Sequence, residues 1–125
     1  MADKLVENYL AYINEADVPI PYIMGLAMIS YNRYKDNIAN SRRACDNYTS
    51  DAKSKCLVSF KLSETNRLMA ELDAIRGRCR ATKNPEKCSE RMNKKIDSVA
   101  LKIDKLEDQA QMINRRIMAK ARMKK

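Results

Sequence analysis

Apolar residues recur along this chain at intervals of three and four, which is the spacing of one face of an α-helix. Within residues 3–16 this face consists of Val6, Tyr9, Ile13 and Ala16. Pro19 and Pro21 interrupt the pattern, because each proline disfavours helix in the residue before it. We therefore predict a short N-terminal helix and a proline-containing break within residues 1–20.

Three longer stretches carry the same pattern after this break, and we predict helices over residues 21–45, 50–80 and 85–119. Thr49, Ser50 or Asp51 could cap the second of them. Asn84 and Pro85 mark the start of the last, because asparagine accepts from free N–H groups and proline needs no partner at the first helical position. With only 2 Gly and 3 Pro, the chain has little room for the turns of an all-β fold. We expect a single all-α domain over residues 1–125.

The strongest pattern lies in the last predicted helix. Its apolar stripe comprises Cys88, Met92, Ile96, Val99, Ile103, Leu106, Ala110, Ile113 and Ile117. From Met92 onward this spacing is typical of a coiled coil. A helix over residues 85–119 would be about 50 Å long, which exceeds the diameter of most small domains. We therefore expect the distal part of the stripe, Leu106, Ala110, Ile113 and Ile117, to bind a protein partner in a homo- or hetero-oligomeric assembly.

The four cysteines lie close to the predicted turns. Cys45 and Cys56 flank the first interhelical turn, and Cys79 and Cys88 flank the second. Antiparallel helices that meet at a turn can bring such positions within disulfide reach. We predict the pairs Cys45–Cys56 and Cys79–Cys88, although four cysteines permit three connectivities. The fold expected is an elongated antiparallel three-helix bundle with a short N-terminal helix and two disulfides.

Two other roles for the cysteines are open at this point. A four-cysteine zinc site usually contains closely spaced pairs, whereas here ten, twenty-two and eight residues separate successive cysteines and the chain has no His, so we predict no metal. Free buried thiols are the stronger alternative, because Met1 is not followed by a secretory signal and the cytosol keeps thiols reduced. Disulfides would imply oxidation after release from a cell.

Charge is distributed unevenly along the chain, whose net charge is +9. The end of the chain is basic, with residues 120–125 forming a predicted tail. The basic residues from position 115 onward are Arg115, Arg116, Lys120, Arg122, Lys124 and Lys125. Such a cluster favours contact with a polyanion or an acidic protein surface. The alternative is a solvated terminus that contributes only solubility.

The sequence contains no recognisable catalytic constellation, and we predict no catalytic residue and no cofactor. Without His the usual general base is missing, and no Gly-rich phosphate loop is present. Nonspecific nucleic-acid binding is an alternative function, because basic clusters lie at both ends of the last predicted helix. The aromatic residues all precede position 61, which argues against base stacking.

A membrane role is a weaker alternative. The longest apolar run, residues 18–31, is shorter than the roughly 20 residues that a membrane span needs. Membrane binding is therefore not expected, although a membrane-active virion protein using residues 18–31 is left open.

The cysteine pairs bound two segments, ACDNYTSDAKSKC and CRATKNPEKC, which a helix separates, and a long Lys/Ile/Leu-rich helix follows the second. In this feature the chain from Cys45 to about Arg115 resembles small Lys-rich, cysteine-paired helical virion-associated proteins of tailed bacteriophages. The resemblance implies an accessory or structural virion component that is made in the host cytoplasm and oxidised later; otherwise a cytoplasmic protein is expected. Residues 1–44 are not part of this resemblance. The sequence as a whole predicts a non-enzymatic assembly protein.

Overall fold

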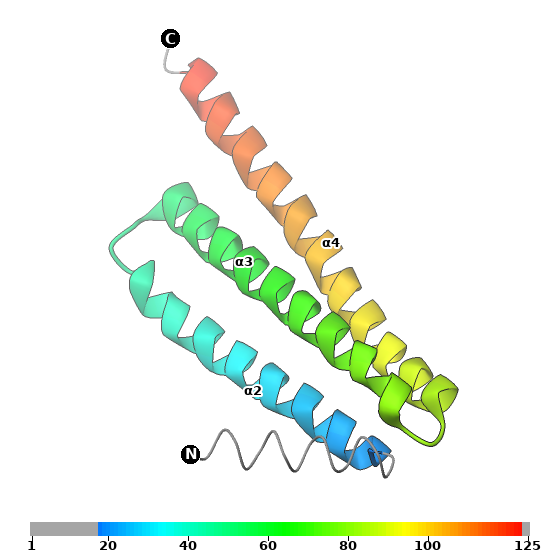
Figure 1. Ribbon diagram of the computed structural model, residues 1–125. Helices are drawn as coiled ribbons and strands as arrows, with labels where there is room; N and C mark the ends of the chain where they lie inside the picture. Colours follow the sequence, from blue (N-terminus) through cyan, green and yellow to red (C-terminus); the bar gives the residue numbers. More distant parts are fainter. Residues whose placement is uncertain (1–17, 124–125) are drawn as a thin grey trace.

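The computed structural model describes residues 18–123 and consists of three long helices packed antiparallel (Figure 1). These are α2 (Ile20–Ala44), α3 (Ser50–Gly77) and α4 (Pro85–Met123), with a short 3₁₀ turn, η1 (Arg78–Ala81), between α3 and α4. The predicted all-α, three-helix architecture is confirmed. The helix predicted near the N-terminus lies outside the described residues, as do Lys124 and Lys125 of the predicted tail.

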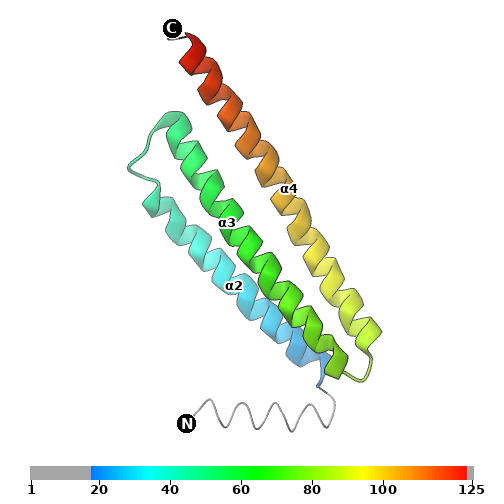
Figure 2. The same ribbon diagram turned by 45° about the horizontal axis from the view of Figure 1, so that its top comes forward.

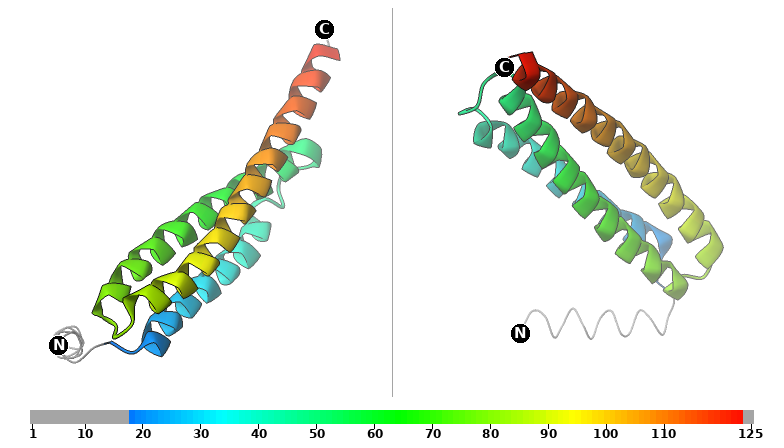
Figure 3. Two further views of the ribbon diagram at one scale, coloured as in Figure 1. Left: turned by 90° about the vertical axis from the view of Figure 1, so that its right-hand side faces the viewer. Right: turned by 90° about the horizontal axis from the view of Figure 1, so that it is seen from above.

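The central element is α3, which packs against α2 on one side and α4 on the other. Contacts between α2 and α4 are few, so the helices form an elongated and rather open bundle (Figures 2 and 3). Because α4 has 39 residues and α3 has 28, the last turns of α4 extend beyond the start of α3. We call the end of the bundle near η1 proximal and the opposite end distal.

The predicted helix boundaries need small corrections. The helix predicted to end at residue 80 leaves α-helical geometry at Gly77 and closes through η1, which is a common way to tighten a helix end. The last helix continues to Met123 instead of ending at 119, so the first four residues of the predicted basic tail are helical. Lys120 is one of them, and its ion pair to α3, described below, holds this turn in place.

The caps differ at the two turns. Asn84 caps α4 as predicted, because its Oδ1 accepts from the Lys87 backbone N–H at 3.1 Å. Thr49 precedes α3, but its side chain makes no capping hydrogen bond. Ser50 has φ of 54°, a left-handed conformation that non-glycine residues adopt at some cost. The carboxylate of Asp51 faces α4 instead of the start of its own helix.

The hydrophobic core is concentrated at the proximal end, where all three helices meet. Its fully buried members are Val18, Ile23, Ala27, Leu68, Leu72, Cys79, Cys88, Met92 and Val99. The backbone N–H of Val18 donates to the Ala81 carbonyl at 2.8 Å, which ties the segment before α2 to η1. Toward the distal end only a few further residues are buried, among them Cys45, Val58 and Ile113. The proximal end therefore supplies most of the apolar burial that stabilises the fold.

Three side-chain hydroxyl groups are buried within the bundle, and each of them has a hydrogen-bond partner. Ser41 donates to the Ile38 carbonyl at 2.6 Å, Thr65 to the Lys61 carbonyl at 2.5 Å, and Thr82 to the Cys79 carbonyl at 2.7 Å. Thr65 also receives a hydrogen bond from the hydroxyl of Tyr34 at 3.0 Å, since its own proton is directed at Lys61. Each buried hydroxyl is thereby satisfied, as buried polar groups must be.

Both predicted disulfides are present and join consecutive helices across their turns. Cys45–Cys56 links the end of α2 to α3 with Cα atoms 5.8 Å apart, and Cys79–Cys88 links η1 to α4 with Cα atoms 5.5 Å apart. The free-thiol and zinc alternatives do not describe these four cysteines. The sulfurs of the second pair belong to the core, whereas Cys56 is only half-buried.

This difference in burial predicts unequal effects of removing the two disulfides. Chain entropy alone gives about 3 kcal/mol for each, because the closed loops are of similar length. We expect C79A/C88A to lower the free energy of unfolding by more than C45A/C56A, because it also removes two sulfurs from the packed core. Urea unfolding of the oxidised variants, followed by circular dichroism, measures both values. An equal or larger loss in C45A/C56A would contradict the proximal location of the stabilising core.

Candidate partner-binding surface

The apolar stripe of α4 packs against α3 along most of its length. Ile113 is only 5% exposed, because α3 reaches far enough along α4 to cover most of it, and its contact with a partner stays a prediction. Leu106, Ala110 and Ile117 are half-buried. Their contact with a partner stays a prediction, and only their outward edges are accessible for it.

A groove lies between α3 and the distal half of α4, and we call it the distal groove. It has a volume of about 590 Å³ and is lined by Ser54, Leu57, Val58, Lys61, Gln109, Met112, Ile113, Arg115 and Arg116. Its floor is apolar, because Val58 and Ile113 are buried there, and Met112 on its rim is 63% exposed. Lys61, Arg115 and Arg116 make the rim basic. An apolar floor with a cationic rim suits a helix that is apolar on one face and acidic at its edges.

Part of the predicted polyanion-binding cluster is engaged within the chain. Asp51 at the start of α3 forms ion pairs with two α4 side chains, Lys120 at 2.6 Å and Arg116 at 4.0 Å. Arg115 and Arg122 are exposed, and Lys124 and Lys125 lie outside the described residues. The cluster is therefore divided, and Arg116 and Lys120 fasten α4 to α3.

The cations on α4 also alter the acidity of Asp51. A hydrogen bond from Lys120, reinforced by the charges of Lys120 and Arg116, lowers the pKa of the Asp51 carboxyl against a smaller opposing effect of burial. A lowered pKa means that the ionised form of the Asp51 carboxyl is more favourable in the folded chain than in the unfolded chain. The ion pair therefore stabilises the distal end only while Asp51 is charged.

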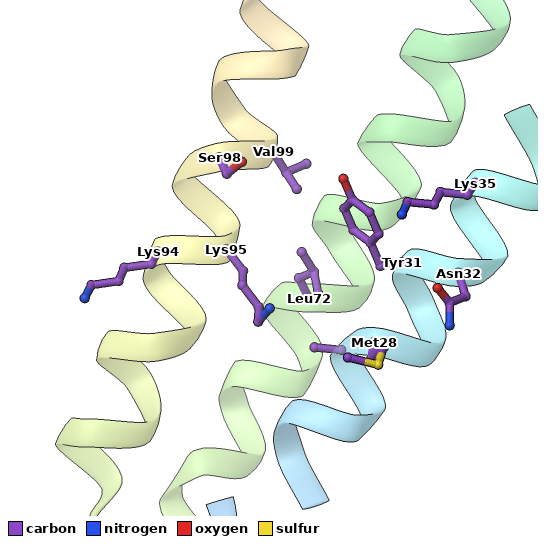
Figure 4. Close-up of a pocket in the computed structure, with 10 residues that line it drawn as sticks. Met28, Tyr31, Asn32, Lys35, Leu72, Lys94, Lys95, Ser98 and Val99 are labelled. Carbon is purple, nitrogen blue, oxygen red and sulfur yellow. The ribbon is translucent and has the colours of Figure 1, made fainter. Parts of the chain in front are cut away.

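A second groove runs between α2 and α4 above α3, and we call it the proximal groove (Figure 4). It has a volume of about 490 Å³ and is lined by Ala27, Met28, Tyr31, Asn32, Lys35, Leu72, Lys94, Lys95, Ser98 and Val99. Ala27, Leu72 and Val99 are buried and form an apolar floor. In Figure 4, Tyr31 and Lys95 point into the space over Leu72, whereas Lys94 points away from it.

Tyr31 is surrounded by lysines at this groove. Lys102 donates to the Tyr31 hydroxyl at 2.6 Å, and the ammonium groups of Lys35 and Lys102 each lie 4.9 Å from the ring centroid. The hydrogen bond from Lys102 lowers the pKa of Tyr31, with the charges of Lys35 and Lys95 acting in the same direction and burial opposing them. The site can thus bind an anionic group beside an apolar surface.

The two grooves lie along one flank of α4. Lys95, Lys102, Gln109 and Arg116 follow one another at intervals of seven residues, a spacing that keeps side chains on one side of a helix. Lys95 lines the proximal groove, while Gln109 and Arg116 line the distal one. The flank beside the apolar stripe, more than the stripe itself, is therefore the accessible surface of α4.

Exposed apolar residues also occur on α4, and the sequence interpretation missed them. Leu101, Met112 and Met123 are 63%, 63% and 86% exposed, and Met118 is 57% exposed. The first three are spaced by eleven residues, which is close to three full helical turns. This interval of eleven residues could have indicated the exposed apolar positions, but the stronger spacing of three and four residues obscured it.

Residues 18–123 contain no group of three or more acidic or cysteine side chains placed to hold a metal ion. No helix among them is long and apolar enough to cross a membrane. Val18, Ile23 and Ala27 from the apolar run at residues 18–31 are buried in the core, whereas Met28 and Ile29 are 64% and 58% exposed.

The Asp51 ion pairs predict a specific dependence of stability on pH. Since the pKa of Asp51 is lowered in the folded chain, its contribution is present above the ordinary value of 3.8 and is lost as pH falls below that value. We expect D51N to unfold at a lower temperature than the unsubstituted protein at pH 7, and the difference to shrink progressively as pH falls below 3.8. Thermal unfolding between pH 2 and pH 7 measures this. D104N removes a carboxylate from an exposed α4 position and should show no such convergence; matching profiles for the two variants would refute the assignment.

Comparison with protein-family models, with curated proteins and with solved structures found no match to this chain. Its functional assignment therefore rests on its own residues. The observations that bear on it are the two grooves on one flank of α4, the cationic rims of both, and the exposed apolar side chains along the same helix.

Proposed function

We propose that this protein is a non-enzymatic structural component that binds a protein partner through the distal groove and the adjoining end of α4. The observation that carries the proposal is the composition of that groove, in which Val58 and Ile113 form an apolar floor between basic side chains. The sequence resemblance to virion-associated phage proteins supports a phage particle as the assembly. A particle also supplies the oxidising exterior in which the disulfides would persist after release.

The shape and charge of the groove favour a helical segment as the bound part of the partner. A groove of about 590 Å³ holds a few side chains, not a whole domain, and buried apolar anchors contribute most of the affinity at such contacts. Met112 and Leu57 line the groove, where they would contact the apolar anchors of the partner. Arg115 and Lys61 on the rim favour acidic residues beside the anchors and disfavour basic ones.

Nonspecific nucleic-acid binding is the alternative, and the division of the basic cluster argues against it. Binding to phosphates increases with the number of cations available to neutralise them. Arg116 and Lys120 are held by Asp51, so contact with a phosphate would compete with an existing ion pair. The alternative predicts binding to any DNA or RNA that weakens steeply with salt.

A pair of matched substitutions tests the proposed surface. Met112 lies on the distal groove and Leu101 outside it, on the same helix, and both are 63% exposed. M112E introduces a charge where the partner would be buried, so we expect its copy number in purified phage particles to fall by about tenfold, as for the loss of a binding anchor. L101E should be incorporated normally. Quantitative mass spectrometry of the particles gives both values.

Two results would contradict the proposal. Absence of the unsubstituted protein from purified particles would refute the virion assignment. Equal incorporation of M112E and L101E would refute the distal groove as the binding surface. Circular dichroism of both variants controls for folding, which exposed substitutions should leave intact.

A further inference from the structure

We propose that the proximal groove is a binding site for a phosphate group, which lysines of α2 and α4 hold between them. The walls of the groove indicate this ligand, because its floor is closed: Ala27, Leu72 and Val99 are 2%, 1% and 2% exposed and offer little surface to an apolar ligand. This inference is independent of the proposed function, because it concerns a different groove and a small anion instead of a protein partner.

The walls of this groove carry positive charge without a compensating carboxylate. Lys35 on α2 and Lys95 on α4 line it, and none of the described residues that line it is acidic. Lys102 on α4 joins them, because its ammonium group donates to the hydroxyl of Tyr31 at 2.6 Å. Within residues 18–123 no ion pair involves any of these three lysines. A bound anion would therefore neutralise charge that the described helices do not.

The three charges converge around Tyr31. The ammonium groups of Lys35 and Lys102 each lie 4.9 Å from the centroid of its ring, and Figure 4 shows Lys95 pointing into the space over Leu72 beside it. Cations placed this close repel one another, and the face of one aromatic ring offsets only part of the repulsion. An anion among them would instead be attracted from two helices at once.

The hydrogen-bond donors of the groove fit a phosphate better than a carboxylate. The Tyr31 hydroxyl accepts from Lys102, so its own proton can be donated to a ligand. Asn32 and Ser98 add an amide and a hydroxyl to the lining. A phosphate group presents at least three acceptor oxygens, whereas a carboxylate presents two. A phosphate can therefore accept from both sides of the groove at the same time.

Binding would connect two helices that otherwise contact each other little. Both α2 and α4 pack on α3, but they have few contacts with each other. Lys35 and Lys95 reach the groove from these two helices (Figure 4). A phosphate held by both lysines would be released whenever α2 and α4 separated, so its binding free energy would stabilise this side of the bundle.

Titration of the ¹⁵N-labelled full chain with inorganic phosphate, at an ionic strength kept constant with chloride, tests the site by nuclear magnetic resonance. We expect the amide signals of Asn32 and Ser98 to shift and saturate with one common dissociation constant. K95A should raise this constant about fivefold, the upper range for one exposed ion pair. K94A removes the same charge from the adjacent residue, whose side chain points away from the groove (Figure 4), and should change it by less than about twofold because of screening.

Two results would refute the site. One is a set of shifts that do not saturate, and the other is an equal loss of affinity in K94A and K95A. Circular dichroism of the variants controls for folding, which substitution of exposed lysines should leave intact.

Amide hydrogen exchange tests the connection between the helices. At a phosphate concentration of about nine times the dissociation constant, exchange of α2 amides through openings that separate α2 from α4 should slow about tenfold. K35A/K95A at the same phosphate concentration should show no such slowing. Phosphate binding without slower exchange in the unsubstituted chain would overturn the bridging of α2 and α4.

Phosphate groups occur both free and in nucleic acids, and a second probe distinguishes these sources. A short single-stranded DNA that binds more tightly than inorganic phosphate, with the same loss in K95A, would identify a nucleic-acid backbone as the source. Equal or weaker binding of the DNA would identify a free phosphate. Both results support the site, whereas DNA binding without any response to inorganic phosphate would overturn it, because that result indicates a charged surface instead of a site.

Discussion

The packing of α4 on α3 around the Cys79–Cys88 disulfide is the constraint on which the rest of the structure depends. Both sulfurs lie in the core with Leu72, Met92 and Val99, so the covalent bond and the apolar burial act at the same place. Val18 is tied to η1 beside them, which fixes where α2 begins. The proximal groove lies between α2 and α4, which have few contacts with each other, whereas the distal groove lies between α3 and α4.

Most of the fold was predictable from the sequence, because its determinants are local. The intervals of three and four fixed the helices, Asn84 and Pro85 fixed the start of α4, and turn-flanking cysteines fixed the disulfides. The end of α4 was predicted too early, since the ion pairs that hold Lys120 join residues far apart in sequence. Contacts between residues that are far apart in the chain produce no periodic pattern in the sequence. The 3₁₀ geometry of η1 was likewise missed, because it depends on how the chain closes toward Cys88.

The candidate site was predicted less well than the fold. The stripe of α4 identifies the apolar face correctly, but a single stripe does not reveal whether its partner lies within the chain. Ile113 is largely covered by the chain's own helices and also lines the distal groove, so it belongs to the internal packing and to the candidate surface at once. The grooves depend on how α4 lies against α2 and α3, and contacts between residues far apart in the sequence determine this placement.

The two ends of the α3–α4 seam are held by different kinds of bond, and this has a mechanical consequence. At the distal end Asp51 holds α4 through ion pairs, while at the proximal end the hold is covalent. Tension on the C-terminus would peel α4 from α3 one turn at a time, since the weak contacts are met first. Peeling would stop at Cys88. The part of α4 beyond Val99 would extend before the proximal core gives way, because Met92 and Val99 are buried in that core.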